Sequence, residues 1–256
     1  MASFTLYEGE MLAHLRSLED DSVDALIADP PYSSGGFTRG DRNQTTHEKY
    51  AGDQCVERPS FSGDNRDGRS WCYWMALWLS ECHRIVRPGG HALMFCDWRM
   101  LPLATDAFQS GGFVWRGLVA WDKGRGARAP HTGYFRHQCE YIVWGSAEHL
   151  DSAKHGGPFD GCIRETVKQS DKHHQTGKPT KLLESLIKIV PEGGTVLDPF
   201  MGSGTTGVAC GRHNRNFIGI ELSREYYRIA QKRVRESFAE YVGDPTQMEL
   251  PLFNGD

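Results

Sequence analysis

Short apolar segments alternate along the chain with longer segments in which apolar residues recur every three or four positions. The run at residues 23–28 is of the kind that forms a strand buried on both faces of a sheet. We expect further strands at 4–7 (an edge strand), 91–96, 112–121, 140–144, 195–198 and 216–221. Helical spacing predicts helices at 10–18, 71–86, 101–109, 180–190, 205–211 and 223–235. This alternation predicts an α/β fold.

A tetrapeptide that combines a carboxylate with an aromatic ring, Asp29-Pro30-Pro31-Tyr32, follows the run at 23–28 directly. Proline fixes φ and has no N–H group, so the segment leaves the sheet with its carbonyl groups held in place. The carboxylate and the ring then project where open α/β sheets bind ligands. The ring can stack on a flat heteroaromatic amine, whose amino hydrogens the Asp29 carboxylate and the Pro30 carbonyl can accept. The alternative is a proline-rich turn that only closes the strand.

A glycine-rich turn, Phe200-Met201-Gly202-Ser203-Gly204-Thr205-Thr206, separates a predicted strand from a predicted helix. Glycine allows a tight turn and a close approach to a ligand, and a helix N-terminus offers free N–H groups. The next strand ends in Glu221, whose carboxylate can bind both hydroxyls of a ribose. The spacing Gly202-x-Gly204-x-x-Gly207 also matches the dinucleotide fingerprint of NAD enzymes. Too few residues follow Glu221 for a second nucleotide-binding half, and no Gly-Lys-Ser/Thr follows the glycines, which excludes a Walker-type loop.

Together these two segments resemble the DNA amino-methyltransferases that use S-adenosylmethionine. Residues 29–32 are similar to their catalytic motif and residues 200–206 to their cofactor motif. The catalytic motif comes first in this chain, which is the order of the beta class, and the resemblance spans residues 5–236. His174-Gln175-Thr176-Gly177-Lys178-Pro179 resembles the element that precedes the cofactor motif, usually His-Pro-Thr-Gln-Lys-Pro, and matches best at Lys178-Pro179. The resemblance implies a Rossmann-like methyltransferase fold, with a mixed, mostly parallel seven-stranded sheet, helices on both faces and a circularly permuted motif order.

The same resemblance implies methyl transfer from S-adenosylmethionine to the exocyclic amine of a base flipped out of double-stranded DNA. Hydrogen bonds from the amine to Asp29 and to the Pro30 carbonyl would localise the nitrogen lone pair, while Tyr32 would hold the ring. The catalytic residues implied are Asp29, Pro30, Pro31 and Tyr32. The cofactor-binding residues implied are Asp29, Lys178, Asp198, Phe200, Gly202, Ser203, Gly204, Thr205 and Glu221.

The identity of the target is less sharply indicated than the reaction. Aspartate at the head of the tetrapeptide resembles the adenine-N6 enzymes, so a site-specific adenine DNA methyltransferase is the first expectation. Cytosine-N4 enzymes more often carry serine there, which leaves cytosine as the close alternative. A catalytically inactive DNA-binding regulator with the same fold is the alternative from another class, and the two intact motifs argue against it. The motif order disfavours an RNA or protein substrate.

Contact with DNA must come from local basic stretches, because the net charge is −4. The polar segment 33–70 follows Tyr32 and is expected to be a mobile loop that closes over the base. Residues 122–177 lie between the two motifs, where the beta class carries target recognition, and they combine basic with aromatic side chains. A solvated charged surface is the alternative. The candidate DNA-binding residues are Arg39, Arg42, Lys123, Arg125, Arg128, Tyr134 and Arg136.

The length of 256 residues predicts one catalytic domain at 1–240 and a C-terminal tail at 241–256. The tail resembles the short peptides that dock replication proteins on a sliding clamp, through Gln247, Leu250, Leu252 and Phe253. A tail packed on its own domain is the alternative. The tryptophan-rich helix at 71–86 is expected to be core or a homodimer face. The basic residues of the last helix are expected on its solvated side: Arg224, Arg228, Lys232, Arg233 and Arg235.

The seven cysteines are scattered without a disulfide framework or a metal-ligand spacing, which fits reduced thiols in a cytosol and no metal site. No apolar run is long enough to cross a membrane, and no signal peptide opens the chain. We therefore expect a cytoplasmic protein of a bacterium, phage or prophage, of the kind found in restriction–modification systems.

Overall fold

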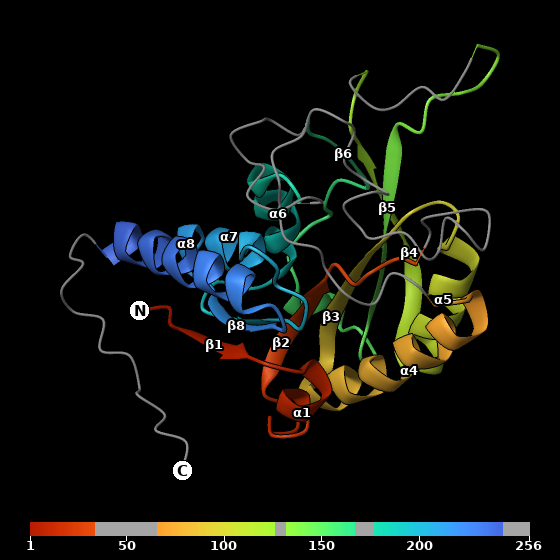
Figure 1. The fold of residues 1–256 in the computed structure, drawn as a ribbon. Coiled ribbons are helices and arrows are strands. Elements are labelled where there is room, and N and C mark those ends of the chain that lie inside the picture. Colours follow the sequence, from red (N-terminus) through yellow and green to blue (C-terminus); the bar gives the residue numbers. More distant parts are fainter. Residues whose placement is uncertain (34–65, 126–131, 167–176, 243–256) are drawn as a thin grey trace.

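The computed structural model describes residues 1–33, 66–125, 132–166 and 177–242, which form one layer of strands between two layers of helices (Figure 1). The strands are β1 (Phe4–Glu8), β2 (Val23–Ala28), β3 (Val86–Cys96), β4 (Val114–Asp122), β5 (Cys139–Ser146), β6 (Cys162–Arg164), β7 (Thr195–Asp198) and β8 (Asn216–Glu221). The α-helices are α1 (Met11–Leu15), α4 (Gly68–Ile85), α5 (Leu101–Ser110), α6 (Thr180–Leu186), α7 (Thr205–Arg212) and α8 (Arg224–Val242). Two short 3-10 helices are η1 (Ser152–Lys154) and η3 (Ile187–Ile189).

The described strands form a single eight-stranded sheet in the order β1-β8-β7-β2-β3-β5-β4-β6. β5 runs antiparallel to both of its neighbours, and the other strand pairs of the described residues are parallel. The mixed, mostly parallel sheet predicted from the sequence is thus confirmed. The predicted number of seven strands is wrong, because β6 pairs with the end of β4. With only three residues, β6 is too short to show the apolar pattern that marks the other strands.

The central strand β2 lies between β7 and β3 and is buried along its whole length. From β2 the chain passes through α4 to β3 on one side, whereas from β7 it passes through α7 to β8 on the other side. The carboxyl ends of β2 and β7 therefore form the topological switch point, where open α/β sheets bind ligands. These two strands are direct neighbours, since Leu26 pairs with Leu197.

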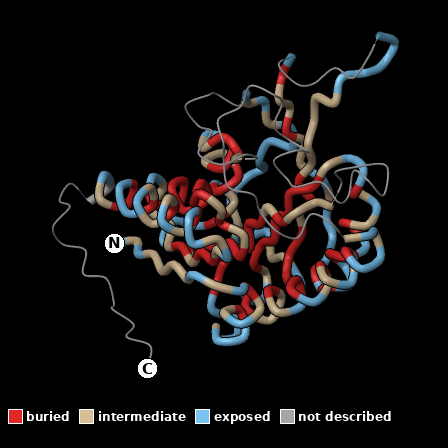
Figure 2. Tube along the Cα trace, in the orientation of Figure 1, coloured by how far each residue is buried: buried red, intermediate tan, exposed pale blue. Residues whose placement is uncertain are grey.

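Alternate residues of the central strand face two separate cores, as the period of a strand requires. Leu26 and Ala28 pack with residues of α1, α4 and α5 in one core. Ala25 and Ile27 pack with residues of α6, α7 and α8 in the other. Figure 2 shows the buried residues concentrated along the central strands and on the inner faces of the helices. The helices therefore cover both faces of the sheet, as predicted.

The tryptophan-rich helix α4 contributes mainly to the core. Trp71 and Trp78 are fully buried, whereas Tyr73 and Leu77 are exposed on the outer side of the helix. Burying a large aromatic side chain of this kind stabilises a fold by about 2–3 kcal/mol. The core interpretation is thus confirmed for the two tryptophans, and a role of α4 as a homodimer face stays a prediction.

Two element boundaries differ from those predicted. β3 begins at Val86 rather than at residue 91, because Val86 pairs with Val23 before residues 87–90 bulge out of register. The last helix continues beyond residue 235 to Val242, and Phe238 in this extension is buried against the sheet. In both cases a contact with residues distant along the chain lengthens an element beyond the range that its apolar pattern predicts.

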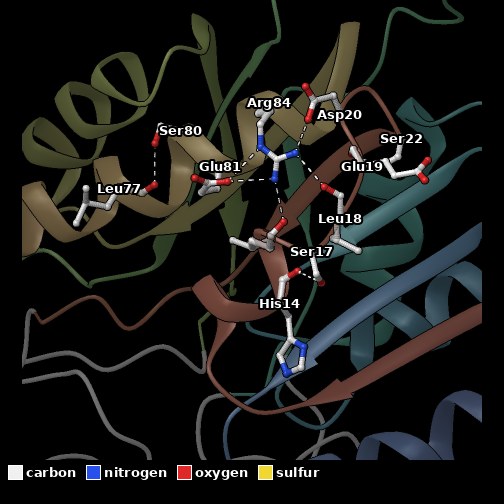
Figure 3. Close-up of polar contacts among 11 residues, drawn as sticks. His14, Ser17, Leu18, Glu19, Asp20, Ser22, Leu77, Ser80, Glu81 and Arg84 are labelled. Atoms are coloured by element: carbon white, nitrogen blue, oxygen red, sulfur yellow. Dashed lines mark hydrogen bonds and ion pairs between the residues drawn. The ribbon is translucent and has the colours of Figure 1, made fainter. Parts of the chain in front are cut away.

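The Arg84 side chain joins the end of α4 to the segment that leads into β2 (Figure 3). Its guanidinium donates to the carbonyl oxygens of Leu15 and Leu18 at 3.0 and 2.9 Å. It also forms ion pairs with Asp20 at 2.5 Å and Glu81 at 3.1 Å. A planar group with several fixed donors suits this arrangement, which a flexible ammonium group would not reproduce. Arg84 thereby fixes the chain at the start of the strand that carries the tetrapeptide.

We expect Arg84→Met to lower the free energy of unfolding by about 2–4 kcal/mol, because two carbonyl groups and two carboxylates lose a charged donor. Urea unfolding followed by circular dichroism measures the effect. The control is Arg224→Met, since Arg224 lies 3.8 Å from Glu8 and its side chain is 72% exposed, so its ion pair is worth less than about 0.5 kcal/mol. Equal effects of the two substitutions would contradict this role of Arg84.

Candidate active site

The tetrapeptide Asp29–Tyr32 leaves the carboxyl end of β2 at the switch point of the sheet. The Tyr32 hydroxyl donates to Asp29 Oδ1 at 2.7 Å. The indole Nε1 of Trp71 donates to the Pro31 carbonyl at 2.8 Å, and the full burial of Trp71 fixes this contact. Burial, and after it the Asp29 carboxylate, raises the pKa of Tyr32 well above its ordinary value, so the hydroxyl remains a donor. The tetrapeptide is thus held by one hydrogen bond between its own residues and by another from α4.

Two lysines and two carboxylates meet beside Tyr32. Lys178 Nζ lies 2.6 Å from Asp29 Oδ2 and 3.7 Å from Glu140 Oε2. Lys123 Nζ lies 3.0 Å from Glu140 Oε1. Burial disfavours the charge of Lys178, but the carboxylates of Asp29 and Glu140 raise its pKa above the ordinary lysine value. Burial also disfavours the charge of Glu140, yet the Lys178 and Lys123 ammonium groups lower its pKa. The cluster therefore holds two positive and two negative charges in balance.

Sequence reasoning did not single out Glu140 or Trp71 as site residues. Glu140 stands in a predicted strand, where the only available signal was a charged residue beside an apolar run. Trp71 is one of several tryptophans at helical spacing, and nothing in that pattern tells a core residue from one that donates to the tetrapeptide. Trp71 contacts Pro31, which lies 40 positions away along the chain, and Glu140 contacts Tyr32, which lies 108 positions away.

The glycine-rich turn lies between β7 and α7, on the strand next to β2. Gly202 and Gly204 have φ values of +53° and +80°, in the left-handed region that favours glycine. A Cβ atom at Gly204 would lie 3.0 Å from the Cα and Cβ atoms of Ala230 in α8, and one at Gly207 would lie 2.6 Å from the Phe217 ring. The first glycine pair therefore shapes the turn, and Gly207 allows α7 to pack closely on the sheet.

The carboxylate of Glu221 is positioned at the end of β8, facing the turn. Its Oε2 accepts from the Gly202 N–H at 2.9 Å, and its Oε1 accepts from the Ser223 N–H at 2.7 Å. Burial raises its pKa above the ordinary value. Each carboxylate oxygen has a further lone pair for a hydroxyl group. A tight turn at Gly202 and Gly204, with a half-buried carboxylate beside it, fits the ribose end of a nucleoside cofactor.

Asp198, predicted as a cofactor-binding residue, has both oxygens occupied within the protein. Oδ2 accepts from the Thr206 hydroxyl at 2.6 Å, and Oδ1 accepts from the Phe200 N–H at 3.0 Å. Burial raises the pKa of Asp198 to about 7, although these two hydrogen bonds lower it. The nearby carboxylates of Asp29 and Glu221 also raise it. Asp198 therefore ties the strand to the turn and to α7, and a direct contact with the cofactor stays a prediction.

The other predicted turn residues are held by neighbouring elements. Phe200 packs edge-on against Trp78 of α4, with 5.0 Å between the ring centroids. Arg233 of α8 donates to the carbonyl oxygen and hydroxyl of Ser203 at 2.5 and 3.1 Å, and to the Thr205 hydroxyl at 3.4 Å. The expectation that Arg233 belongs to the solvated side of the last helix is therefore wrong. A helix face rich in basic residues gave no sign that one of them reaches a neighbouring turn.

The predicted DNA-binding residues divide into three groups. Lys123 points into the cluster around Glu140, so its ammonium already has a carboxylate partner. Arg125, Tyr134 and Arg136 are exposed on the described parts of the connection between β4 and β5, whose residues 132–138 project from the body of the molecule (Figure 1). The remaining three lie outside the described residues: Arg39, Arg42 and Arg128.

Several predicted segments lie wholly or partly outside the described residues. They are most of the polar segment at 33–70, part of the candidate recognition region at 122–177, and the tail with Gln247, Leu250, Leu252 and Phe253. At the described ends of the polar segment, the Arg66 N–H donates to the Ser33 hydroxyl at 3.4 Å, and Asp67 caps α4. The Arg66 guanidinium lies 4.5 Å from the centre of the Trp74 ring. The segment therefore starts and ends close to the tetrapeptide.

Among the residues that the structure describes, no group of three or more histidine, cysteine, aspartate or glutamate side chains could hold a metal ion. In the same part of the chain, the helices are too short or too polar to cross a membrane. The six cysteines in the described ranges are free thiols.

Comparison with known proteins identifies the family. Residues 23–153 and 151–232 match the model of the N6/N4 methyltransferase family, which is described as DNA methylase. Type II methyltransferase M2.DpnII of Streptococcus pneumoniae is 28% identical over 248 residues, covering 90% of this chain and 88% of the relative. Type II methyltransferase M.HinfI of Haemophilus influenzae is 29% identical over 254 residues, covering 91% of this chain and 68% of the relative.

The crystal structure of the M1.HpyAVI–SAM complex has the same fold, with a TM-score of 0.65 at 24% identity, covering 90% of this chain and 98% of that chain. The family match covers both the tetrapeptide at the end of β2 and the glycine-rich turn before α7. The chain therefore belongs to the N6/N4 family of DNA methylases.

Proposed function

We propose that this DNA methylase transfers the methyl group of S-adenosylmethionine to the N6 amine of an adenine flipped out of double-stranded DNA. The observation that carries the proposal is the position of the Asp29 carboxylate. It lies at the switch point beside Tyr32, on the strand adjacent to the glycine-rich turn. An acceptor for an amine thus lies next to a cradle for a nucleoside cofactor.

The amine requires help because its lone pair is delocalised into the ring. Hydrogen bonds from the two amino hydrogens to Asp29 and to the Pro30 carbonyl would localise the lone pair and stabilise positive charge developing on nitrogen. The Tyr32 ring would hold the base by stacking, and the duplex must release the base for this contact to form. The Trp71 indole would keep the following carbonyl, that of Pro31, in place. Most of the rate enhancement would come from positioning.

The cofactor supplies an electrophilic methyl group on a sulfonium. Gly202, Ser203, Gly204 and Thr205 would hold it at the turn, with Glu221 on the ribose hydroxyls and Phe200 alongside. Arg233 and Asp198 would act indirectly, since they fix the turn that makes the contacts. Lys178 would lie near the transferred group through its contact with Asp29.

Contact with the duplex would come from the exposed connection between β4 and β5 and from the polar segment at 33–70. Arg125, Tyr134 and Arg136 would meet phosphates or bases, together with Arg39, Arg42 and Arg128. We assign the catalytic unit to residues 1–240, with target recognition within 122–177. Dimerisation through α4, docking of the tail at 241–256 on a sliding clamp, and a cytoplasmic location complete the proposal.

The base is identified by incubating the purified protein with double-stranded DNA and tritium-labelled S-adenosylmethionine and separating the bases after hydrolysis. We expect the label in N6-methyladenine. Label in N4-methylcytosine would keep the chemistry and change the target, because Asp29 and Tyr32 can hold either exocyclic amine. Binding of the cofactor without label in any base would favour an inactive DNA-binding regulator.

A further inference from the structure

The hydrogen-bond donors on Asp29 both have a second acceptor within reach, the carboxylate of Glu140. Asp29 accepts from the Tyr32 hydroxyl at 2.7 Å and from Lys178 Nζ at 2.6 Å. Glu140 Oε2 lies 3.5 Å from the same hydroxyl and 3.7 Å from the same ammonium group. Each donor therefore lies between two carboxylates and is bound more closely by Asp29.

We propose that Glu140 is a positioning residue of the methyl-transfer site, which receives the Tyr32 hydroxyl and the Lys178 ammonium when the target amine binds Asp29. This inference rests on the proposed function, because it assumes that an amine becomes the partner of Asp29. It adds a residue that the tetrapeptide and the cofactor turn do not contain.

The transfer strengthens Asp29 as an acceptor for the amine, because each of its oxygens already holds one donor. A hydroxyl has a single hydrogen and serves one acceptor at a time, so Tyr32 cannot fully satisfy both carboxylates. A carboxylate that already holds an ammonium group is a weaker acceptor for a neutral amine. The Lys178 side chain is only 8% exposed, so its charge cannot move into water without a large rearrangement. Glu140 offers the nearest anionic site within the cluster.

The distances make this transfer a small motion. A shift of Lys178 by about 1 Å would bring its Nζ from 3.7 Å to within an ordinary N–H···O distance of Glu140. Tyr32 needs a smaller adjustment, because its hydroxyl is already at 3.5 Å. No proton has to change position in either case, since the cluster keeps two ammonium and two carboxylate groups throughout.

Glu140 is itself held firmly enough to act as the receiving group. It lies in β5, where it pairs with Trp121 of β4. Lys123, which follows β4, contacts Oε1 at 3.0 Å, leaving Oε2 directed toward Tyr32 and Lys178. Lys123 therefore acts within the site, where it holds Glu140 in place instead of binding a phosphate.

The test is the single-turnover methylation rate of Glu140→Gln, which keeps the shape of the side chain and removes its charge. We expect the rate to fall about 10- to 100-fold, as for a misplacement of the reacting groups by about 1 Å. The dissociation constant for S-adenosylmethionine, measured by calorimetry, should stay within about three-fold because the cofactor turn is untouched. Glu140→Asp keeps the charge but has a shorter reach. Its methylation rate should lie between those of the wild type and Glu140→Gln.

The matched control is Glu184→Gln in α6. Glu184 also forms one close ion pair, with Arg212 at 2.9 Å, and its side chain is 24% exposed against 20% for Glu140. We expect the control to methylate at the wild-type rate. Urea unfolding of both variants separates a loss of stability from a loss of rate, since only the latter supports a positioning role.

A double substitution tests the transfer of the hydroxyl directly. In a Tyr32→Phe background there is no hydroxyl to receive, so Glu140→Gln should cost several-fold less than in the wild type. An equal cost in both backgrounds would overturn the inference, as would a wild-type rate for Glu140→Gln. Failure of the proposed function would be distinct, because the wild-type protein would then methylate no base at all.

Discussion

Replacing Asp29 with asparagine is expected to lower the single-turnover methylation rate by about 1,000-fold, near the upper end of what removing one electrostatic contact in an active site costs. Asparagine keeps the shape of the side chain but removes the negative charge that would stabilise a positive charge developing on the amine. The loss also deprives Lys178 of the carboxylate that lies 2.6 Å from its Nζ. Rapid quenching of labelled cofactor and DNA at saturating enzyme measures the rate.

Two controls accompany this substitution. Asp106→Asn removes an exposed carboxylate of α5, outside the tetrapeptide, the cofactor turn and the target-recognition range, and should leave the rate unchanged. The affinity of Asp29→Asn for S-adenosylmethionine should fall by less than about ten-fold, because the turn and Glu221 remain. A variant that methylates within about ten-fold of the wild type would remove Asp29 from the role of amine acceptor.

The second large effect is expected at the cofactor turn. Gly204→Ala places a Cβ atom 3.0 Å from the Cα and Cβ atoms of Ala230, at a φ of +80°. We expect the affinity for S-adenosylmethionine to fall at least about ten-fold, because the turn must shift to relieve this contact. The free energy of unfolding should fall by about 2–4 kcal/mol, from the backbone strain and the contact together. Calorimetry measures the first quantity and urea unfolding the second.

Gly193→Ala separates backbone strain from the contact. Gly193 has a similar φ of +75°, but nothing lies within 4 Å of its Cβ position. The control should lose about 1–2 kcal/mol of stability from the left-handed backbone alone and keep its affinity for the cofactor. If both variants bound the cofactor equally well, the turn at Gly204 would not be the cradle.

The sequence predicted the framework of the site because that framework depends on local patterns. Apolar runs marked β2 and β7, and the rule that ligands bind at the switch point of open α/β sheets placed Asp29 near the glycine-rich turn. The positive φ values at Gly202 and Gly204 agree with the reason for expecting glycine there. Apolar runs and glycine-rich turns determine the local backbone structure directly, so the structure contains the elements that they predict.

The contacts that complete the site depend on tertiary structure and could not be predicted. Arg233 is one of several basic residues on a helix, and only the packing of α8 directs it to Ser203. Lys123 fits a stretch suited to DNA, yet the pairing of β4 with β5 brings it to Glu140. Charge alone does not say whether a side chain faces solvent, a phosphate or a buried partner. The short β6 escaped prediction for a similar reason, since pairing with β4 and not its own composition makes it a strand.

The most direct measurement is nucleoside mass spectrometry of genomic DNA from a methylation-free bacterial host that expresses the wild-type chain or, as control, Asp29→Asn. We expect N6-methyladenine in DNA from cells with the wild-type chain and its absence in DNA from cells with the variant. This result would establish both the reaction and the catalytic role of the tetrapeptide. Sequencing would then identify the recognition site. Unmethylated DNA from cells that contain soluble, cofactor-binding wild-type protein would contradict the account.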